Sequence, residues 1–184
     1  METAQEVLEL IARREPGLQR QLEAVAGATL LEALRAAEQE RARMILCDAL
    51  GFRHEAGAVA DLVACLEDES PRVRSAAADA LAKIADPSAG EALMARFELP
   101  DPDLGVRRML LSALGAVGHR PAIPMLIRWL GNPDPSQRGA AAWSLGALRA
   151  TEAESALEEA LRVERIPYPK ERISEALRAL RRAT

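Results

Sequence analysis

Residues 68–93 read DESPRVRSAAADALAKIADPSAGEAL, and this stretch decides the fold. Three consecutive alanines, residues 76–78, stand where a helix in an ordinary core would carry leucine. Alanine loses almost no side-chain entropy on burial, and its small side chain lets helix backbones approach closely. We therefore expect this helix to be clamped between neighbouring helices, with Leu81 and Ile84 filling the remaining volume.

The same pattern recurs along the chain at intervals of 31 to 33 residues, which is the signature of a repeat protein. The pairs Val73-Arg74 and Ala80-Leu81 return as Val106-Arg107 and Ala113-Leu114. Looser copies stand at 42–43 with 49–50, at 137–138 with 144–145, and at 170 with 176–177. We call the helix that carries this pattern helix A.

A second helix, helix B, follows helix A in each unit. Its apolar residues are spaced by four, which places them on one helical stripe. They are Ala58, Leu62 and Leu66; Ala89, Leu93 and Phe97; Ala122, Leu126 and Leu130; and Ala153, Leu157 and Leu161. Turn residues at 86–88, 118–121 and 131–135 separate the helices, so each unit is a helical hairpin.

These units resemble HEAT repeats of the short type found in phycobilisome lyase subunits. Asp68, Val73-Arg74, Ala76-Ala77 and Ala80-Leu81 carry the resemblance, with Ala89 and Leu93 following, and it covers about residues 38–182. It implies an all-α, right-handed α-solenoid of about five short helical hairpins. It says little about activity, because solenoids of this kind host unrelated functions.

We expect one continuous domain in three parts: N-terminal capping helices in residues 1–37, repeats in 38–161, and a connection with a C-terminal capping helix in 162–184. Residues 3–14 and 17–26 read as two short helices broken by Pro16-Gly17, and 28–37 as a helix B. Residues 170–182 read as a lone helix A. The connection 163–169 is the least regular segment, and it is either a functional insertion or simply a longer turn.

The composition excludes several classes of protein. A net charge of −4 with 28% charged residues argues against a general nucleic-acid binder, which normally has a strong basic excess. Residues 1–100 hold 11 Lys/Arg and 18 Asp/Glu, so this part could attract a basic partner. The acidic, amphipathic N-terminus does not read as a signal peptide, and we expect no membrane span because no apolar run is long enough. Cys47 and Cys65 form no CxxC pair and read as buried residues of a reducing, cytoplasmic compartment.

An arginine stands in the first turn of each helix A, at positions 43, 74, 107 and 138. A positive charge there opposes the helix dipole and needs a carboxylate nearby. Asp68 and Asp101 lie six residues before Arg74 and Arg107, and Asn132 takes the equivalent place before Arg138. The resemblance to HEAT repeats implies that these residues form an arginine–aspartate ladder that ties successive turns together.

No motif points to catalysis or to a cofactor. The sequence holds no GxSxG, P-loop or glycine-rich dinucleotide turn. Deoxyhypusine hydroxylases bind two irons through several His-Glu pairs, but this chain has one such pair, His54-Glu55, and its other histidine is followed by Arg120. Cys47, Cys65, His54 and His119 match no zinc-ligand spacing. We expect neither metal nor cofactor, and no enzymatic activity.

We predict that a partner protein binds the concave face formed by the helices B, at Arg96, Met125, Arg128 and Trp129. Tryptophan, arginine and methionine are residue types enriched at protein interfaces. An alternative is that Trp129 only covers the seam between repeats. Trp143 lies on the outer side of a helix A, where it is either covered by the 163–169 connection or exposed as a contact.

The function predicted from the sequence is that of a protein–protein interaction scaffold or adaptor. A second possibility, from the family resemblance, is a lyase-type chaperone or enzyme subunit that attaches a bilin to an antenna protein. A remote third is a HEAT-like DNA glycosylase, in which a concave basic groove carries tryptophans. The residues of this chain that weakly match such a groove are Trp129, Trp143, Arg96 and Arg128. The net acidity argues against that reading.

Overall fold

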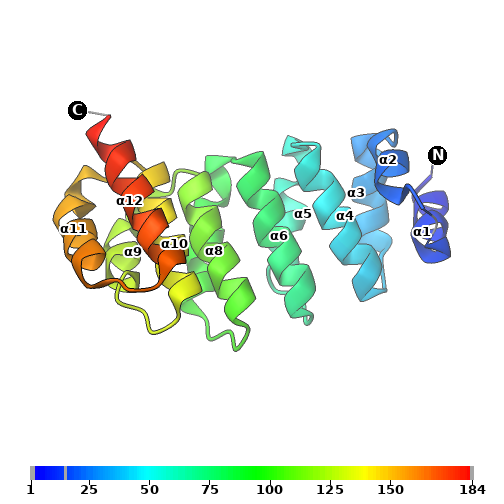
Figure 1. Ribbon diagram of the computed structural model, residues 1–184. Coiled ribbons are helices and arrows are strands. Elements are labelled where there is room, and N and C mark those ends of the chain that lie inside the picture. The colour runs from blue at the N-terminus through cyan, green and yellow to red at the C-terminus, as the bar shows by residue number, and fades with distance from the viewer. Residues whose placement is uncertain (1–2, 15, 183–184) are drawn as a thin grey trace. The chain divides into compact units, whose positions relative to one another are not determined.

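The computed structural model describes residues 3–14 and 16–182, and these residues form helices and turns without any strand (Figure 1). The predicted all-α fold is thereby confirmed. The chain forms two compact units, residues 1–89 and residues 90–184, which we call the N-terminal and the C-terminal unit.

The N-terminal unit pairs two helices A with two helices B. Helix A α4 packs against helix A α6, while α3 packs on α4 and α5 packs on α6. Helix α1 packs on α3, and the short α2 lies against α4. The helices are α1 (Ala4–Arg13), α2 (Leu18–Glu23), α3 (Gly27–Ala36), α4 (Glu40–Phe52), α5 (Val59–Cys65) and α6 (Pro71–Ile84). The predicted N-terminal helices are therefore present, with α2 shorter than expected.

In the C-terminal unit three helices A lie side by side in the order α8, α10, α12 (Figure 1). Helices B pack on them: α7 on α8, α9 on α10 and α11 on α12. The bounds are α7 (Gly90–Glu98), α8 (Leu104–Ala116), α9 (Ile123–Trp129), α10 (Pro135–Ala147), α11 (Glu154–Val163) and α12 (Pro167–Arg181).

The helices A begin where the sequence supplies caps. The side chains of Ser70, Asp103 and Asp134 each accept a backbone N–H from the first turn of α6, α8 and α10. Pro71 and Pro135 follow their caps as the first helical residue, where proline's missing N–H costs nothing.

Each of the four helices A from α4 to α10 is followed by a residue in the left-handed backbone conformation. These residues are His54 (φ 50°), Ala85 (φ 57°), Gly118 (φ 75°) and Arg149 (φ 47°). Their spacing of 31, 33 and 31 residues is that of the sequence repeat. A single 3-10 turn follows each of them, at Ala56–Ala58, Pro87–Ala89, Arg120–Ala122 and Thr151–Ala153, and leads into helix B.

Small residues bring the helices A into backbone contact, as the alanine run predicts. Ala76, Ala77, Ala78 and Ala80 are buried. Opposite Ala80, a Cβ atom built on Gly51 would lie 2.6 Å from the Ala80 Cα. The sequence analysis did not anticipate the glycines that complete this packing. A Cβ atom on Gly115 would lie 2.6 Å from the Ser144 Cα, and one on Gly146 would lie 2.9 Å from the Ala176 Cα.

The expected 163–169 connection is shorter than predicted. Only residues 164–166 link α11 to α12, because α12 begins at Pro167 rather than at residue 170. Proline's fixed φ suits the first turn of a helix, so Pro167 and Pro169 start the helix instead of prolonging the turn. The Glu164 carboxylate accepts the backbone N–H groups of Arg165 and Ile166 and so closes this link tightly.

Candidate protein-binding surface

Trp129, the last residue of α9, is half-buried and held by two neighbouring side chains. Its ring meets that of Phe97 from α7 edge-on, with ring centres 4.9 Å apart and planes at 71°. The guanidinium carbon of Arg107 from α8 lies 5.6 Å from the Trp129 ring centre and 5.7 Å from that of Phe97. Arg107 is itself fixed, since its Nε donates to the Asp101 carbonyl at 3.1 Å. The tryptophan is thus a rigid, partly accessible aromatic anchor.

Arg128 stands next to Trp129 and is exposed. It forms no ion pair with any residue that the structure describes. Its guanidinium is therefore available to a carboxylate or an aromatic ring of another molecule. We call Arg128, Trp129 and the supporting Arg107 the Arg128–Trp129 surface.

Two residues predicted to belong to this surface are buried instead. Arg96 is only 7% exposed and forms an ion pair with the buried Asp101. Asp101 belongs to the turn after α7, and this turn folds back so that its carboxylate meets Arg96. The burial of Arg96 therefore depends on the path of that turn in three dimensions. Met125 is 5% exposed, because its long unbranched side chain lies inward against the core. The predicted partner site of four residues therefore reduces to Arg128 and Trp129.

Trp143 on α10 remains 38% exposed. The aromatic residue expected to cover it, Tyr168, packs one helical turn earlier: a Cβ atom on Gly139 would lie 2.4 Å from the Tyr168 ring. Tyr168 is itself 42% exposed and lies under the guanidinium of Arg172, 5.7 Å from the ring centre. Of the two alternatives for Trp143, coverage by the 163–169 segment or exposure, the structure shows a partly covered ring that remains accessible.

The arginines of the helices A bridge turns in a pattern that the sequence only partly reveals. Arg43 binds the Asp68 carboxylate with two hydrogen bonds, of 2.6 and 3.1 Å, across 25 residues. Arg138 binds Glu164 in the same way, at 2.6 and 3.0 Å, across 26 residues. Such two-pronged pairs fix both direction and distance between neighbouring turns. Glu164 was missed, although its spacing from Arg138 nearly matches that of Asp68 from Arg43.

Arginines also cap the turn that precedes their own helix. Arg74 donates to the carbonyls of Asp68 and Glu69, both at 2.9 Å, and Arg138 to those of Asn132 and Pro133. For Arg74 and Arg138, the residue six positions upstream thus accepts through its backbone carbonyl. The Asp68 side chain pairs with the preceding unit's arginine, Arg43, and Asp101 pairs with Arg96.

The paired carboxylates are held in their charged form. Burial opposes the ionisation of Asp68, but hydrogen bonds from Arg43 and from the Ser70 N–H, with the charges of Arg43 and Arg74, outweigh it and lower the Asp68 pKa. The hydrogen bond from Arg138 lowers the pKa of Glu164 against a smaller effect of burial. The carboxylates of Asp68 and Glu164 therefore join neighbouring turns through their arginines, and these pairs are not available to a charged ligand.

The histidines and cysteines serve the turns and the core. His54 Nδ1 lies 2.6 Å from the Lys83 carbonyl at the end of α6, and His119 packs against Gly90 at the start of α7. Cys47 is buried and Cys65 half-buried, and both are free thiols. The hydrogen bond between them, together with burial, raises the pKa of Cys47. Within the described part of the chain, no three His, Cys, Asp or Glu side chains are grouped to bind a metal ion.

None of the described helices is both long and apolar enough to cross a membrane.

Comparison with known proteins agrees with this architecture. The sequence profile of HEAT repeats matches residues 27–104 and 96–178. No curated protein sequence is similar enough to the chain to count as a match. Among solved structures, the complex of CpcE and CpcF of phycocyanin lyase from Nostoc sp. PCC7120 is 26% identical in sequence, with a TM-score of 0.65. That match covers 82% of this chain and 97% of the other.

Two designed armadillo repeat proteins, both 19% identical, share the fold. One, in complex with the peptide (KR)4, has a TM-score of 0.62 and covers 98% of this chain and 100% of the other. The second has a TM-score of 0.57 and covers 97% and 100%. The neighbours thus include complexes with another protein and with a peptide. The matched repeats span most of the sequence, so this chain belongs to the HEAT-repeat family, in the short class that resembles the phycobilisome lyases.

Proposed function

We propose that this HEAT-repeat protein is a scaffold without catalytic activity, and that it recognises another protein through the Arg128–Trp129 surface. One observation carries the proposal: Trp129 is partly accessible, yet Phe97 and Arg107 fix its ring in place. A rigid aromatic side chain loses little entropy when a partner binds it, and tryptophan and arginine dominate the energetics of protein interfaces.

The fold and the chemistry of the chain support this proposal. Solenoids offer extended surfaces for proteins and peptides, and two of the similar solved structures are such complexes. A cytoplasmic location belongs to the same proposal, because free thiols such as Cys47 and Cys65 persist in reducing compartments.

The test is capture of a partner from lysate of the native host, followed by a binding titration with the purified partner. Wild type is compared with Trp129→Ala and with the double variant Arg128→Ala, Trp129→Ala. The matched control is Trp143→Ala, which removes the second tryptophan of the same unit from a different helix. Circular dichroism establishes that each variant is folded.

We expect the Trp129→Ala variant to weaken binding by about 2 kcal/mol or more, a typical hot-spot value. The Trp143→Ala variant should bind like wild type. If the partner is retained by the folded double variant and lost from Trp143→Ala, the site assignment is wrong.

A second candidate is a subunit of a bilin lyase, and the likeness to the CpcE–CpcF complex favours it. A lyase-type chaperone must bind the chromophore or the antenna protein that receives it. The discriminating measurement is the absorbance spectrum of a free linear bilin titrated with the purified protein. A saturable spectral shift supports the lyase reading, whereas an unchanged spectrum and a captured non-antenna partner support the scaffold.

A further inference from the structure

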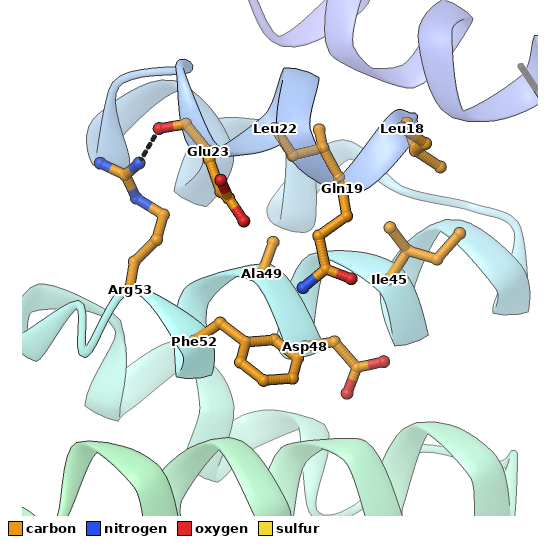
Figure 2. A pocket seen from close by; sticks show the side chains of 9 residues that line it. All are labelled: Leu18, Gln19, Leu22, Glu23, Ile45, Asp48, Ala49, Phe52 and Arg53. Atoms are coloured by element: carbon orange, nitrogen blue, oxygen red, sulfur yellow. Dashed lines mark hydrogen bonds between the residues drawn. The ribbon is translucent and has the colours of Figure 1, made fainter. Parts of the chain in front are cut away.

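A pocket of about 270 Å³ opens between α2 and α4 in the N-terminal unit (Figure 2). Its walls are mostly apolar: Leu18 and Leu22 come from α2, and Ile45, Ala49 and Phe52 come from α4. Phe52 is 53% exposed, so an apolar ring at the pocket is accessible to another molecule. Gln19, Glu23, Asp48 and Arg53 complete the lining.

The Asp48 carboxylate is the distinctive polar group of this pocket. It is half-buried, and it lies beside Phe52 in Figure 2. No hydrogen bond from a described residue acts on this carboxylate. Burial raises the pKa of Asp48, the charge of Lys83 lowers it, and the charge of Asp79 raises it. Lys83 is committed elsewhere, since it pairs with Asp79 and its ammonium lies 3.7 Å from the centre of the Phe52 ring.

Arg53, the one lysine or arginine among the residues that line the pocket, is also engaged. Arg53 donates to the Glu23 carbonyl at the end of α2 (Figure 2). The surrounding unit is acidic: residues 1–89 hold 10 Lys/Arg and 16 Asp/Glu. An apolar pocket with one half-buried carboxylate, in an acidic unit, is complementary to an apolar group that carries a nearby positive charge.

We propose that this pocket docks a basic amphipathic helix of a partner protein. A leucine-sized side chain of that helix would lie among Leu18, Ile45 and Ala49, and a lysine or arginine one turn away would pair with Asp48. Residues three or four apart share a helix face, so one helix presents both groups together. The proposal does not rest on the Arg128–Trp129 surface, which lies in the other unit and has a different chemistry.

The probe is a fluorescently labelled synthetic helix of leucine and lysine, about 15 residues long so that it can form a stable helix. Binding to the full-length protein is followed by fluorescence anisotropy at low salt. Asp48→Asn removes the carboxylate's charge without changing its size, and Ala49→Met fills the pocket. The control Glu32→Gln removes one exposed charge from α3 in the same unit, outside the pocket.

We expect Asp48→Asn to weaken binding of the leucine–lysine helix about tenfold, because a partly desolvated charge pair is lost. Ala49→Met should abolish saturable binding in a protein that is still folded by circular dichroism. Glu32→Gln and Trp129→Ala should bind like wild type, which separates this site from general acidity and from the Arg128–Trp129 surface. Equal affinity of wild type and Asp48→Asn, or equally tight binding of a leucine–glutamate helix, overturns the proposal.

Discussion

Ala85 holds a left-handed backbone conformation that costs a non-glycine residue about 1–2 kcal/mol. The equivalent position in the next unit is Gly118, where the absence of a Cβ atom removes this cost. His54, by contrast, uses its side chain at this position to reach the Lys83 carbonyl. The Ala85 methyl group brings the steric cost of the left-handed conformation, but it can form no hydrogen bond that would offset this cost.

We therefore expect Ala85→Gly to stabilise the protein by about 0.5–1 kcal/mol, measured as the free energy of unfolding in urea. Ala82→Gly, inside helix α6, is the control and should destabilise by about 1 kcal/mol. A loss of stability in Ala85→Gly would mean that the left-handed turn carries no strain.

The lowered pKa values of Asp68 and Glu164 lead to a prediction of how the stability of the protein changes at acidic pH. Both pKa values are lowered in the folded protein, so each carboxylate contributes stability that is fully present above its unfolded pKa of about 4. That stability is lost as the pH falls through the lower folded pKa. Asp68→Asn should reduce stability at pH 7 and flatten the fall in unfolding free energy between about pH 5 and pH 2. Denaturant titrations at a series of pH values measure both effects, and an unchanged slope would contradict them.

At the scale of helices, the distance between neighbouring helices A is set by glycine and alanine. A Cβ atom on Gly115 would lie 2.6 Å from the Ser144 Cα, and backbone cannot move away as a flexible side chain can. The Ser144 hydroxyl also donates to the Leu111 carbonyl at 2.7 Å, so α8 and α10 are joined by a buried hydrogen bond as well as by contact.

Gly115→Ala should therefore destabilise the protein by about 1–3 kcal/mol, even though alanine favours a helix more than glycine does. Gly57→Ala is the control, because the added methyl group would make only ordinary contacts and should change stability by less than about 0.5 kcal/mol. Thermal and urea unfolding measure both. A stabilised Gly115→Ala variant would show that the helices can separate at no cost.

For the whole molecule, charge is the property that bears on partners. The 10 Lys/Arg and 16 Asp/Glu of residues 1–89 contrast with 14 and 12 in residues 90–184. Neither part has the strong excess of Lys and Arg that is typical of proteins that neutralise several phosphates. We expect no saturable binding of labelled duplex DNA at low salt by fluorescence anisotropy. Binding that weakens steeply with added salt would instead support a nucleic-acid role.

The sequence by itself determined the all-α repeat, the order and approximate positions of its helices, and most of the core. The reason is that helix periodicity, turn residues and small buried side chains recur in register, so each unit repeats the information of the last. The columns of Ala58 and Leu62 and their equivalents are buried for this reason.

Only the tertiary structure decided which polar side chains are free. The sequence predicts Arg96 at the surface, but the turn after α7 places Asp101 against it and the two form a buried ion pair. Glu164 pairs with Arg138 because the fold places them opposite each other. The pocket beside Asp48 likewise exists because α2 lies against α4, a contact that no local pattern encodes. Periodicity fixes which way a side chain points from its own helix. Whether it meets solvent or a partner depends on segments that pack there from elsewhere in the chain.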